Sequence, residues 1–298
     1  MDITLLGPQR RVAGARAAVA ELIPDGPVAT INAGWRDRET DTTELNAVLG
    51  GRMVNLELYR RWRQLNEDDP EYAEAERRLT GQLEELRAAY QLRLRHGVAA
   101  VRAVAQRVPA SPIRATAVSD AVAAIRVLDT WHIDRGTELR AAFSAEVRLG
   151  ERASIGDHRR AVAQLLQASA GLVITGGHVG VLLHLLHIFG LAAMIRPPVI
   201  TWSAGAMALS HRVVLFGVHA PFGHHDAEFY AAGLGLYAQG VPFPHARRRL
   251  RLNDPDHLQL LAARLSPYPG LLLDDGVRLD LADQAGPPAG AVLLATAS

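Results

Sequence analysis

The sequence of 298 residues contains no cysteine. This absence excludes disulfides, thiolate zinc sites and a cysteine nucleophile. Lysine is also missing, so all 32 of the basic side chains counted as Lys or Arg are arginines. Without an amine side chain, the protein cannot use a Schiff base, a Walker-type phosphate loop or a Ser–Lys dyad. Both absences narrow the catalytic chemistry that the chain can perform.

A strong charge imbalance and long apolar runs are missing as well. The formal net charge is +1, which does not indicate steering toward nucleic acid or an anionic membrane. No run reaches about 18 apolar residues, and the segment Met1–Gly7 has no basic leader, so we expect neither a membrane span nor a signal peptide. With 49% hydrophobic and 21% charged residues, the composition is that of a globular protein. We therefore expect a cytoplasmic protein.

Short apolar segments alternate with helical segments along the chain. Strands are expected at residues 3–6, 28–33, 171–175 and 199–201. Helices are expected between them, at about residues 11–22 and 179–189 among others. Strands separated by helices imply a mainly parallel sheet that is covered on both faces. We predict one three-layer α/β/α domain over residues 1–298.

Residues 44–107 differ from the rest, because they are rich in Arg, Glu, Leu and Ala. Asp69 and Pro70 form a helix start, with Asp69 as the cap and Pro70 at the first helical position. An apolar stripe then predicts a long helix. The stripe consists of Leu79, Leu83, Leu86 and Tyr90, and Leu56, Tyr59 and Trp62 mark the partner helix before the cap. We predict a helical-hairpin insertion at about residues 44–107, which is a candidate homodimer contact, and further helices at about 115–127 and 158–168.

The segment around Ser203 predicts a nucleophile. An apolar strand at residues 199–201 leads directly to Ser203, and the small residues Ala204, Gly205 and Ala206 follow. A sharp strand-to-helix turn exposes a serine hydroxyl and brings backbone amides close to the oxyanion. Thr201 occupies the position where such turns usually have glycine.

A serine nucleophile needs a base and a group that orients the base. Of the twelve histidines, His245 is the best candidate, since it follows the apolar run Val241–Pro244 and opens an arginine-rich turn. Downstream, the apolar strand 271–273 ends in Asp274 and Asp275, either of which can orient the imidazole. Asp226 is a further candidate for the acid.

Four motifs in this order resemble those of the peptidase E and cyanophycinase family. Thr201–Ala206 is similar to the family's Gly-x-Ser-Ala-Gly-Ala nucleophile run, and Val173–Gly177 looks like its Gly-Gly loop. Gly233–Leu236 followed by His245 resembles the segment of its catalytic histidine. Leu273–Asp275 is similar to the strand that supplies its acid. The resemblance implies a class I glutamine-amidotransferase-like, flavodoxin-like fold.

The resemblance also implies an activity. Ser203 would attack a peptide or amide carbonyl after His245 takes its proton, and an acyl-enzyme would then be hydrolysed. Asp275 would be the acid, and the amides of Gly177 and Ala204 would form the oxyanion hole. The family favours small aspartyl peptides, α- or β-linked, and such substrates need a group that binds a carboxylate. Candidates for substrate binding are Arg36, Arg248, Arg249 and His178, and no cofactor is expected.

Two alternatives remain open. One is a metal-dependent hydrolase, because imidazole and carboxylate side chains gather in one loop and suit zinc. These residues are His219, His224, His225 and Asp226. The other is a non-catalytic member of the fold that binds a ligand or partner. His184 and His187, on the apolar helix after the Gly-Gly loop, are interpreted as packed residues.

Overall fold

A six-stranded sheet forms the centre of the computed structural model, which describes residues 2–9, 14–107, 111–196, 198–217, 226–281 and 286–294. The strand order is β10-β1-β5-β4-β2-β3, and all neighbours are parallel except the antiparallel pair β1 and β10. The mixed α/β class and the mainly parallel sheet are thus confirmed. The strand bounds are β1 Ile3–Leu6, β2 Val28–Ile31, β3 Met53–Asn55, β4 Gly171–Ile174, β5 Val199–Trp202 and β10 Arg278–Leu281.

Helices cover both faces of this sheet. Alternate residues of β4 and β5 point to opposite faces, so Val173 and Ile200 join one apolar cluster while Leu172 and Val199 join another. The first cluster is closed by α1 (Ala15–Leu22) and α2 (Thr43–Val48), and the second by α7 (Val179–Ile188) and α8 (Ala204–Leu209). Burial on both faces explains why these strands are continuous apolar runs.

Two small sheets are formed by the chain that follows β5. The strands β6 (Arg212–Leu215) and β7 (Glu228–Ala232) pair antiparallel, and β8 (Val241–Pro244) and β9 (Gly270–Leu273) pair parallel. Between β8 and β9 lie the short helix α9 (Ala246–Arg249) and the helix α10 (Pro255–Leu265). The α8 helix packs against β8, which joins this unit to the central sheet.

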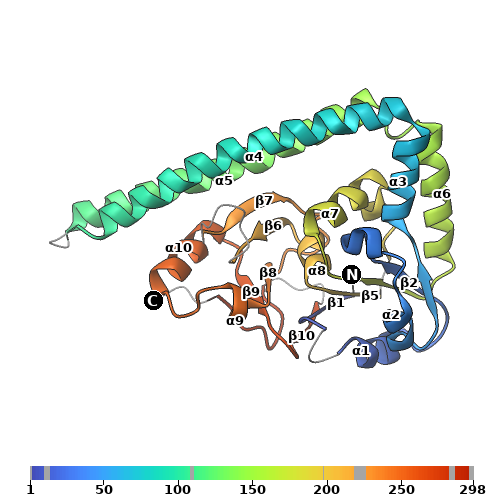
Figure 1. Cartoon of the computed structure of the whole chain (residues 1–298). Helices are drawn as coiled ribbons and strands as arrows, with labels where there is room; N and C mark the ends of the chain where they lie inside the picture. The colour runs from blue at the N-terminus through green and yellow to red at the C-terminus, as the bar shows by residue number, and fades with distance from the viewer. Residues whose placement is uncertain are drawn as a thin grey trace.

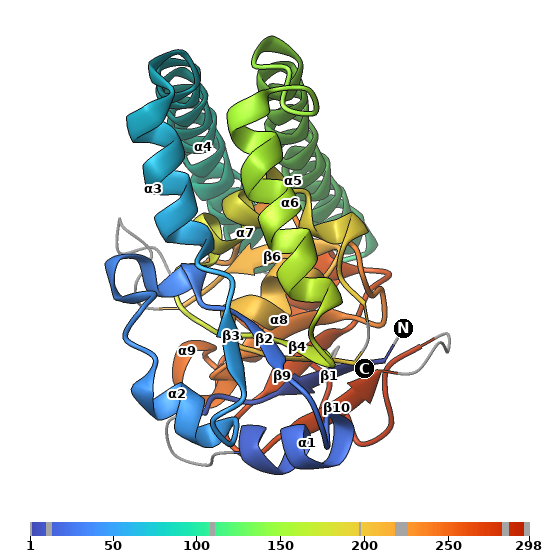
Figure 2. The same cartoon turned by 90° about the vertical axis from the view of Figure 1, so that its right-hand side faces the viewer.

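The helical insertion is longer than the sequence indicated. It comprises α3 (Leu58–Asp68), α4 (Pro70–Ala105), α5 (Pro112–Glu146) and α6 (Ala153–Gln167), all placed between β3 and β4. The prediction of a hairpin within residues 44–107 was wrong in its bounds. In that range β3 is a strand of the sheet and α2 packs on the sheet, and the partner of α4 is α5. Figure 1 shows α4 and α5 as one long antiparallel hairpin above the body, and Figure 2 shows α3 and α6 side by side at its base. No helix in the described part of the chain is both long and apolar enough to cross a membrane.

A buried polar network fixes this hairpin to the body. The carboxylate of Asp129 on α5 accepts hydrogen bonds from Arg264 on α10 at 2.7 and 2.9 Å, and both side chains are 2% exposed. It also accepts one from the Tyr90 hydroxyl of α4 at 2.6 Å. A second ion pair joins Arg87 on α4 to Glu228 on β7, with N–O distances of 2.6 and 2.9 Å. Since buried charges are costly unless paired, these contacts hold the hairpin in one position.

Two histidines give the fold an expected pH dependence. Burial lowers the pKa of His187 and of His211 to about 4, and the positive charges of Arg140 and Arg212 respectively add to the shift. The unfolded chain protonates these imidazoles below about 6.5, so it binds more protons than the folded protein between about pH 6.5 and 4. The free energy of unfolding should therefore fall as the pH falls through this window. Urea titrations at pH 7, 6, 5 and 4 measure it, and the variant His211→Phe should show a shallower slope; an unchanged slope would contradict the assignment.

Candidate active site

Several predicted site residues lie at one edge of the sheet. The strands β2, β4 and β5 are parallel, so the residues that follow them meet at their common carboxyl edge. This is where ligands bind in open α/β sheets. Gly34 follows β2, Gly176 and Gly177 follow β4, and Ser203 follows β5.

Ser203 forms a strained strand-to-helix turn. It follows the last residue of β5 directly, precedes the first residue of α8, and has φ 51° and ψ −120°. A non-glycine residue rarely adopts this conformation, which costs about 1–3 kcal/mol and persists mainly at functional sites. Its side chain is half-buried, while the neighbours Trp202 and Ala204 are buried. This is the backbone geometry of a nucleophile elbow.

The Gly-Gly turn lies directly against this serine. A Cβ atom on Gly176 would lie 3.0 Å from Cβ and 3.5 Å from Oγ of Ser203. Gly177 has φ +120°, and a Cβ there would lie 2.3 Å from the carbonyl oxygen of Gly34. That carbonyl accepts a hydrogen bond from the amide of His178 at 2.8 Å. Only glycine allows these three strand ends to approach so closely.

Thr201, in the position where glycine is usual, is accommodated by Gly205. Thr201 is fully buried, and its hydroxyl donates to the Ile174 carbonyl of β4 at 3.0 Å. A Cβ on Gly205 would lie 2.3 Å from that hydroxyl oxygen. The extra side chain before the serine therefore occupies space that the glycine after it leaves open, and it also links β5 to β4.

Substituting Gly177 tests the role of this turn. In Gly177→Ala, the new methyl group must displace the Gly34 backbone, and the left-handed conformation becomes strained. We expect the rate of a reaction at Ser203 to fall on the order of 100-fold, because a displacement of about 1 Å has that effect in an active site. Gly81→Ala is the matched control, since a Cβ on Gly81 of α4 meets nothing within 4 Å. Equal activity of both variants would contradict the role of the turn.

His245 reaches the same edge through the small sheet of β8 and β9. Its amide donates to the carbonyl of Leu273, the last residue of β9, at 2.9 Å. Asp274 follows β9 and lies against Gly7, where a Cβ would be 1.9 Å from the Asp274 carbonyl oxygen. Gly7 in turn follows β1, whose last residue pairs in register with Trp202. These backbone contacts connect the segment of Ser203, through Gly7 and Asp274, to the segment of His245.

Among the candidates for the carboxylate that orients His245, the contacts favour Asp274 over Asp275 and Asp226. Its Oδ1 accepts from the amide of Arg247 at 3.0 Å, two residues after His245, so this carboxylate lies against the turn that carries the imidazole. Asp275 is exposed in the next turn. Asp226 pairs with Arg102 near the end of α4 at 2.6 Å. The histidines of the loop, His219, His224 and His225, lie outside the described residues, and in the described part no group of three His, Cys, Asp or Glu side chains could hold a metal.

Backbone strain is concentrated at this edge. Five non-glycine residues have a positive φ in the described part of the chain: Arg36, Glu57, Arg148, Ser203 and His245. All but Arg148 lie in segments that follow β2, β3, β5 or β8. Such conformations are kept where the surrounding structure requires them, as in active sites. This distribution points to the carboxyl edge independently of any motif.

The predicted substrate-binding residues occupy two sides of the edge. Arg36 is exposed, with φ 58° and ψ −126°. His178 caps α7, since its Nδ1 accepts from the amide of Val181 at 3.1 Å. Burial and the nearby charge of Arg36 lower the pKa of His178, which favours the neutral imidazole. Arg248 is exposed on α9 close to His245. It therefore lies near the end of β8, whereas Arg36 and His178 lie near the ends of β2 and β4.

Two residues near the edge had no sequence signal. A Cβ on Gly180 of α7 would lie 2.6 Å from the Tyr230 hydroxyl and 3.2 Å from His178, so Tyr230 reaches the start of α7. The guanidinium of Arg87 lies 5.4 Å from the centre of the Tyr230 ring. These residues come from β7 and α4, more than 50 positions away from His178 or from each other, so no local pattern could connect them.

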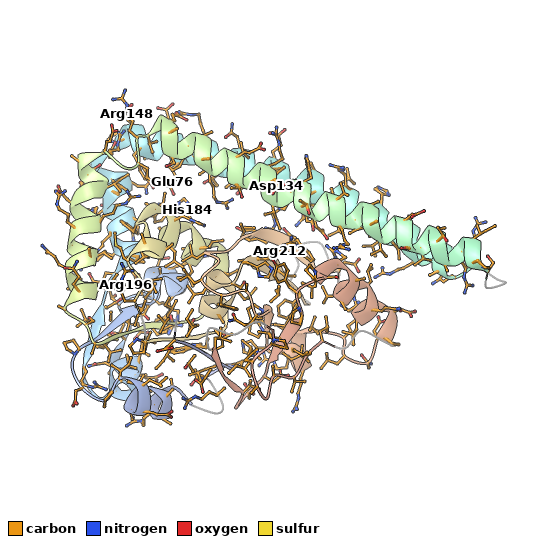
Figure 3. All side chains as sticks on the ribbon, turned by 180° about the vertical axis from the view of Figure 1, so that it is seen from behind. Glu76, Asp134, Arg148, His184, Arg196 and Arg212 are labelled. Carbon is orange, nitrogen blue, oxygen red and sulfur yellow. The ribbon has the colours of Figure 1, made fainter. Side chains whose placement is uncertain are left out.

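A groove of about 740 Å³ lies between α3 and α4, next to the segment that follows β2. Glu76 is buried, lines this groove and accepts one hydrogen bond from Trp62 Nε1 at 2.7 Å. His184 Nε2 lies 2.7 Å from the same carboxylate, and Figure 3 labels both side chains. Burial raises the pKa of Glu76, but the contacts with His184 and Trp62 outweigh burial, so the net pKa is lowered and the carboxylate is ionised. His184 is thus a packed histidine that pairs with a carboxylate.

Comparison with known proteins does not assign the chain to a family: no protein-family model matches it, and no curated protein matches it.

Proposed function

We propose that the protein is a serine hydrolase that cleaves a peptide or amide bond. The observation that carries this proposal is the strained conformation of Ser203 against the Gly176–Gly177 turn. In the proposed mechanism, His245 takes the hydroxyl proton and Ser203 attacks the substrate carbonyl. Backbone amides at Gly177 and Ala204 stabilise the tetrahedral oxyanion, typically by about 3 kcal/mol for each donor. Water then hydrolyses the acyl-enzyme.

The motif order and the geometry of the edge support a class I glutamine-amidotransferase-like fold of the peptidase E type. Asp274 rather than Asp275 orients His245 in this proposal, because Asp274 contacts the backbone of the His245 turn. The substrate is a small aspartyl-type peptide, α- or β-linked. The carboxylate of this substrate pairs with Arg36, which follows β2, or with Arg248, which follows β8.

Covalent labelling tests the nucleophile without knowledge of the substrate. A fluorophosphonate should modify wild-type protein once per chain, and peptide mapping should locate the adduct on Ser203. Parallel assays with α- and β-aspartyl dipeptides and simple amides then define the bond that is cleaved. Labelling at another residue, or turnover that persists in unlabelled Ser203→Ala, would overturn the proposal.

A further inference from the structure

The α4–α5 hairpin separates its charges along its length. Its distal half, residues 87–107 and 112–128, holds seven arginines and one acidic residue, Asp120. Its proximal half, residues 70–86 and 129–146, holds nine acidic residues and four arginines. The whole chain has a formal net charge of only +1. The separation is therefore a property of the hairpin and not of the overall composition.

Helix dipoles do not account for this pattern. Acidic residues near the start and basic residues near the end of α4 agree with its macrodipole, but that effect extends over about one turn only. The α5 helix runs the other way and has Arg114 near its start and Glu146 at its end, which is opposite to the dipole preference. Charge follows position along the hairpin in both helices. A partner whose charges run in the opposite direction would complement this pattern.

Two of the seven distal arginines form ion pairs within the molecule. Arg87 pairs with Glu228 and Arg102 with Asp226, both on the body. The remaining five distal arginines are in no ion pair with an acidic side chain in the described part of the chain. They are Arg93, Arg95, Arg107, Arg114 and Arg126. Arg93 lies over the ring of Trp131, and Arg114 and Arg126 donate to the carbonyls of Arg107 and Ser266, so these three make neutral contacts that leave their charge unpaired.

Large apolar side chains are exposed on the same hairpin. Leu92 is 53% and Val127 70% exposed, and they lie close to the middle of α4 and of α5. A third, Ile113, is 82% exposed at the distal end. Figure 1 shows that one long side of the hairpin faces β7 and α10, and that no other element covers the opposite side. A partner that covered Leu92 and Val127 would remove this apolar area from water, which favours association.

We infer that this uncovered side pairs with the same side of a second copy of the chain. Two antiparallel hairpins would place the basic half of each against the acidic half of the other, with Leu92 and Val127 near the two-fold axis. An axis at the level of residue 90 puts Arg95 opposite Glu85 and brings Arg107 beside Glu74. Such an interface is isologous and closed, so it forms a dimer and does not polymerise.

The hairpin is long enough for a stable interface. Its 36-residue helix α4 spans about 54 Å at 1.5 Å per residue. Two helices, each about 10 Å wide, offer on the order of 1,000 Å², against about 800 Å² per partner in a standard interface. The acidic half argues against nucleic acid or an anionic membrane as the occupant, because both would be repelled by it. The inference does not depend on the proposed function.

Charge reversal and mixing test the pairing. By analytical ultracentrifugation in 50 mM NaCl we expect the wild type to be a dimer that weakens at least about tenfold at 300 mM, since salt screens exposed charges. Arg95→Glu/Arg107→Glu and Glu74→Arg/Glu85→Arg should each be monomeric, and an equimolar mixture should form a heterodimer. Arg196→Glu/Arg251→Glu, which reverses two exposed charges on the body, should stay dimeric. Circular dichroism and thermal unfolding check that each variant is folded.

Three outcomes would overturn the inference. They are a monomeric wild type, a dimer that the hairpin reversals leave intact, and folded reversal variants that do not associate on mixing. For a monomeric wild type, titration with duplex DNA and with anionic phospholipid vesicles would show whether the basic half has one of these other occupants.

Discussion

Replacing Ser203 by alanine should lower kcat/KM for the substrate that the wild type cleaves by a factor of about 10⁴ or more. In the proposed mechanism, the alanine keeps the turn but removes the oxygen that forms the acyl-enzyme, and the oxyanion amides and substrate binding alone leave a small residual rate. Ser119→Ala is the matched control, because Ser119 is exposed on α5, outside the edge of the sheet. Initial rates on the same substrate measure both variants.

The partner histidine gives a second readout of the same mechanism. His245→Ala should lower the rate by a similar factor, and the double variant Ser203→Ala/His245→Ala should be no slower than either single variant. Residues that act as one unit show this strong non-additivity. Losses that multiply in the double variant would show that the two residues act independently, and the Ser–His mechanism would then be wrong.

Replacing Asp129 by alanine should lower the free energy of unfolding by about 3–5 kcal/mol. The substitution leaves the guanidinium of Arg264, 2% exposed, without its carboxylate, and an uncompensated buried charge has a cost of this size. It also removes the acceptor of the Tyr90 hydroxyl. Urea unfolding monitored by circular dichroism measures the change.

Asp134→Ala is the control for this effect, because Asp134 is exposed on the same helix, and it should change stability by less than about 0.5 kcal/mol. The double variant Asp129→Leu/Arg264→Met should recover most of the loss, since apolar side chains can replace a buried ion pair. A loss in the double variant as large as in Asp129→Ala would show that the charge of Arg264 is not the cause.

The separation of the two effects follows from where the residues lie. Ser203 sits at the edge of a preformed sheet, so its loss should affect chemistry and leave stability nearly unchanged. Asp129 connects α5 to α10, so its loss should affect stability first. Because Arg87 and Tyr90 share α4, a loosened hairpin should also disturb Tyr230 beside His178. A reduced activity of Asp129→Ala at saturating substrate would reveal this connection.

The elements that pattern alone determined are the buried strands and their turns. Val199–Trp202 and Gly171–Ile174 are short, mainly apolar runs with Pro or Gly at their start, and their length and these neighbours favour a buried parallel strand. Ser203 and the glycines of residues 176–177 follow these strands directly. Parallel pairing then requires them to share an edge, so the candidate nucleophile could be named before the structure.

The partner of α4 was decided only by tertiary packing. The α5 helix contains many alanines and one glycine, Gly136, so its apolar stripe is weak. For this reason the sequence predicted a helix only at residues 115–127. The buried residues of α5 pack against leucines of α4, two of which would lie within 4 Å of a Cβ on Gly136. Periodicity shows that a face is apolar, but not what covers it.

What the sequence by itself determined is therefore local: the α/β class, the strand ends and the strained serine position, because each depends on neighbours within a few residues. The tertiary structure decided which distant groups meet there. It brought Asp274 to the turn of His245, Gly34 to the glycine turn that follows β4, and Arg87 to Glu228. Those contacts join residues far apart in the chain, and their energy depends on burial and distance, which only the folded chain defines.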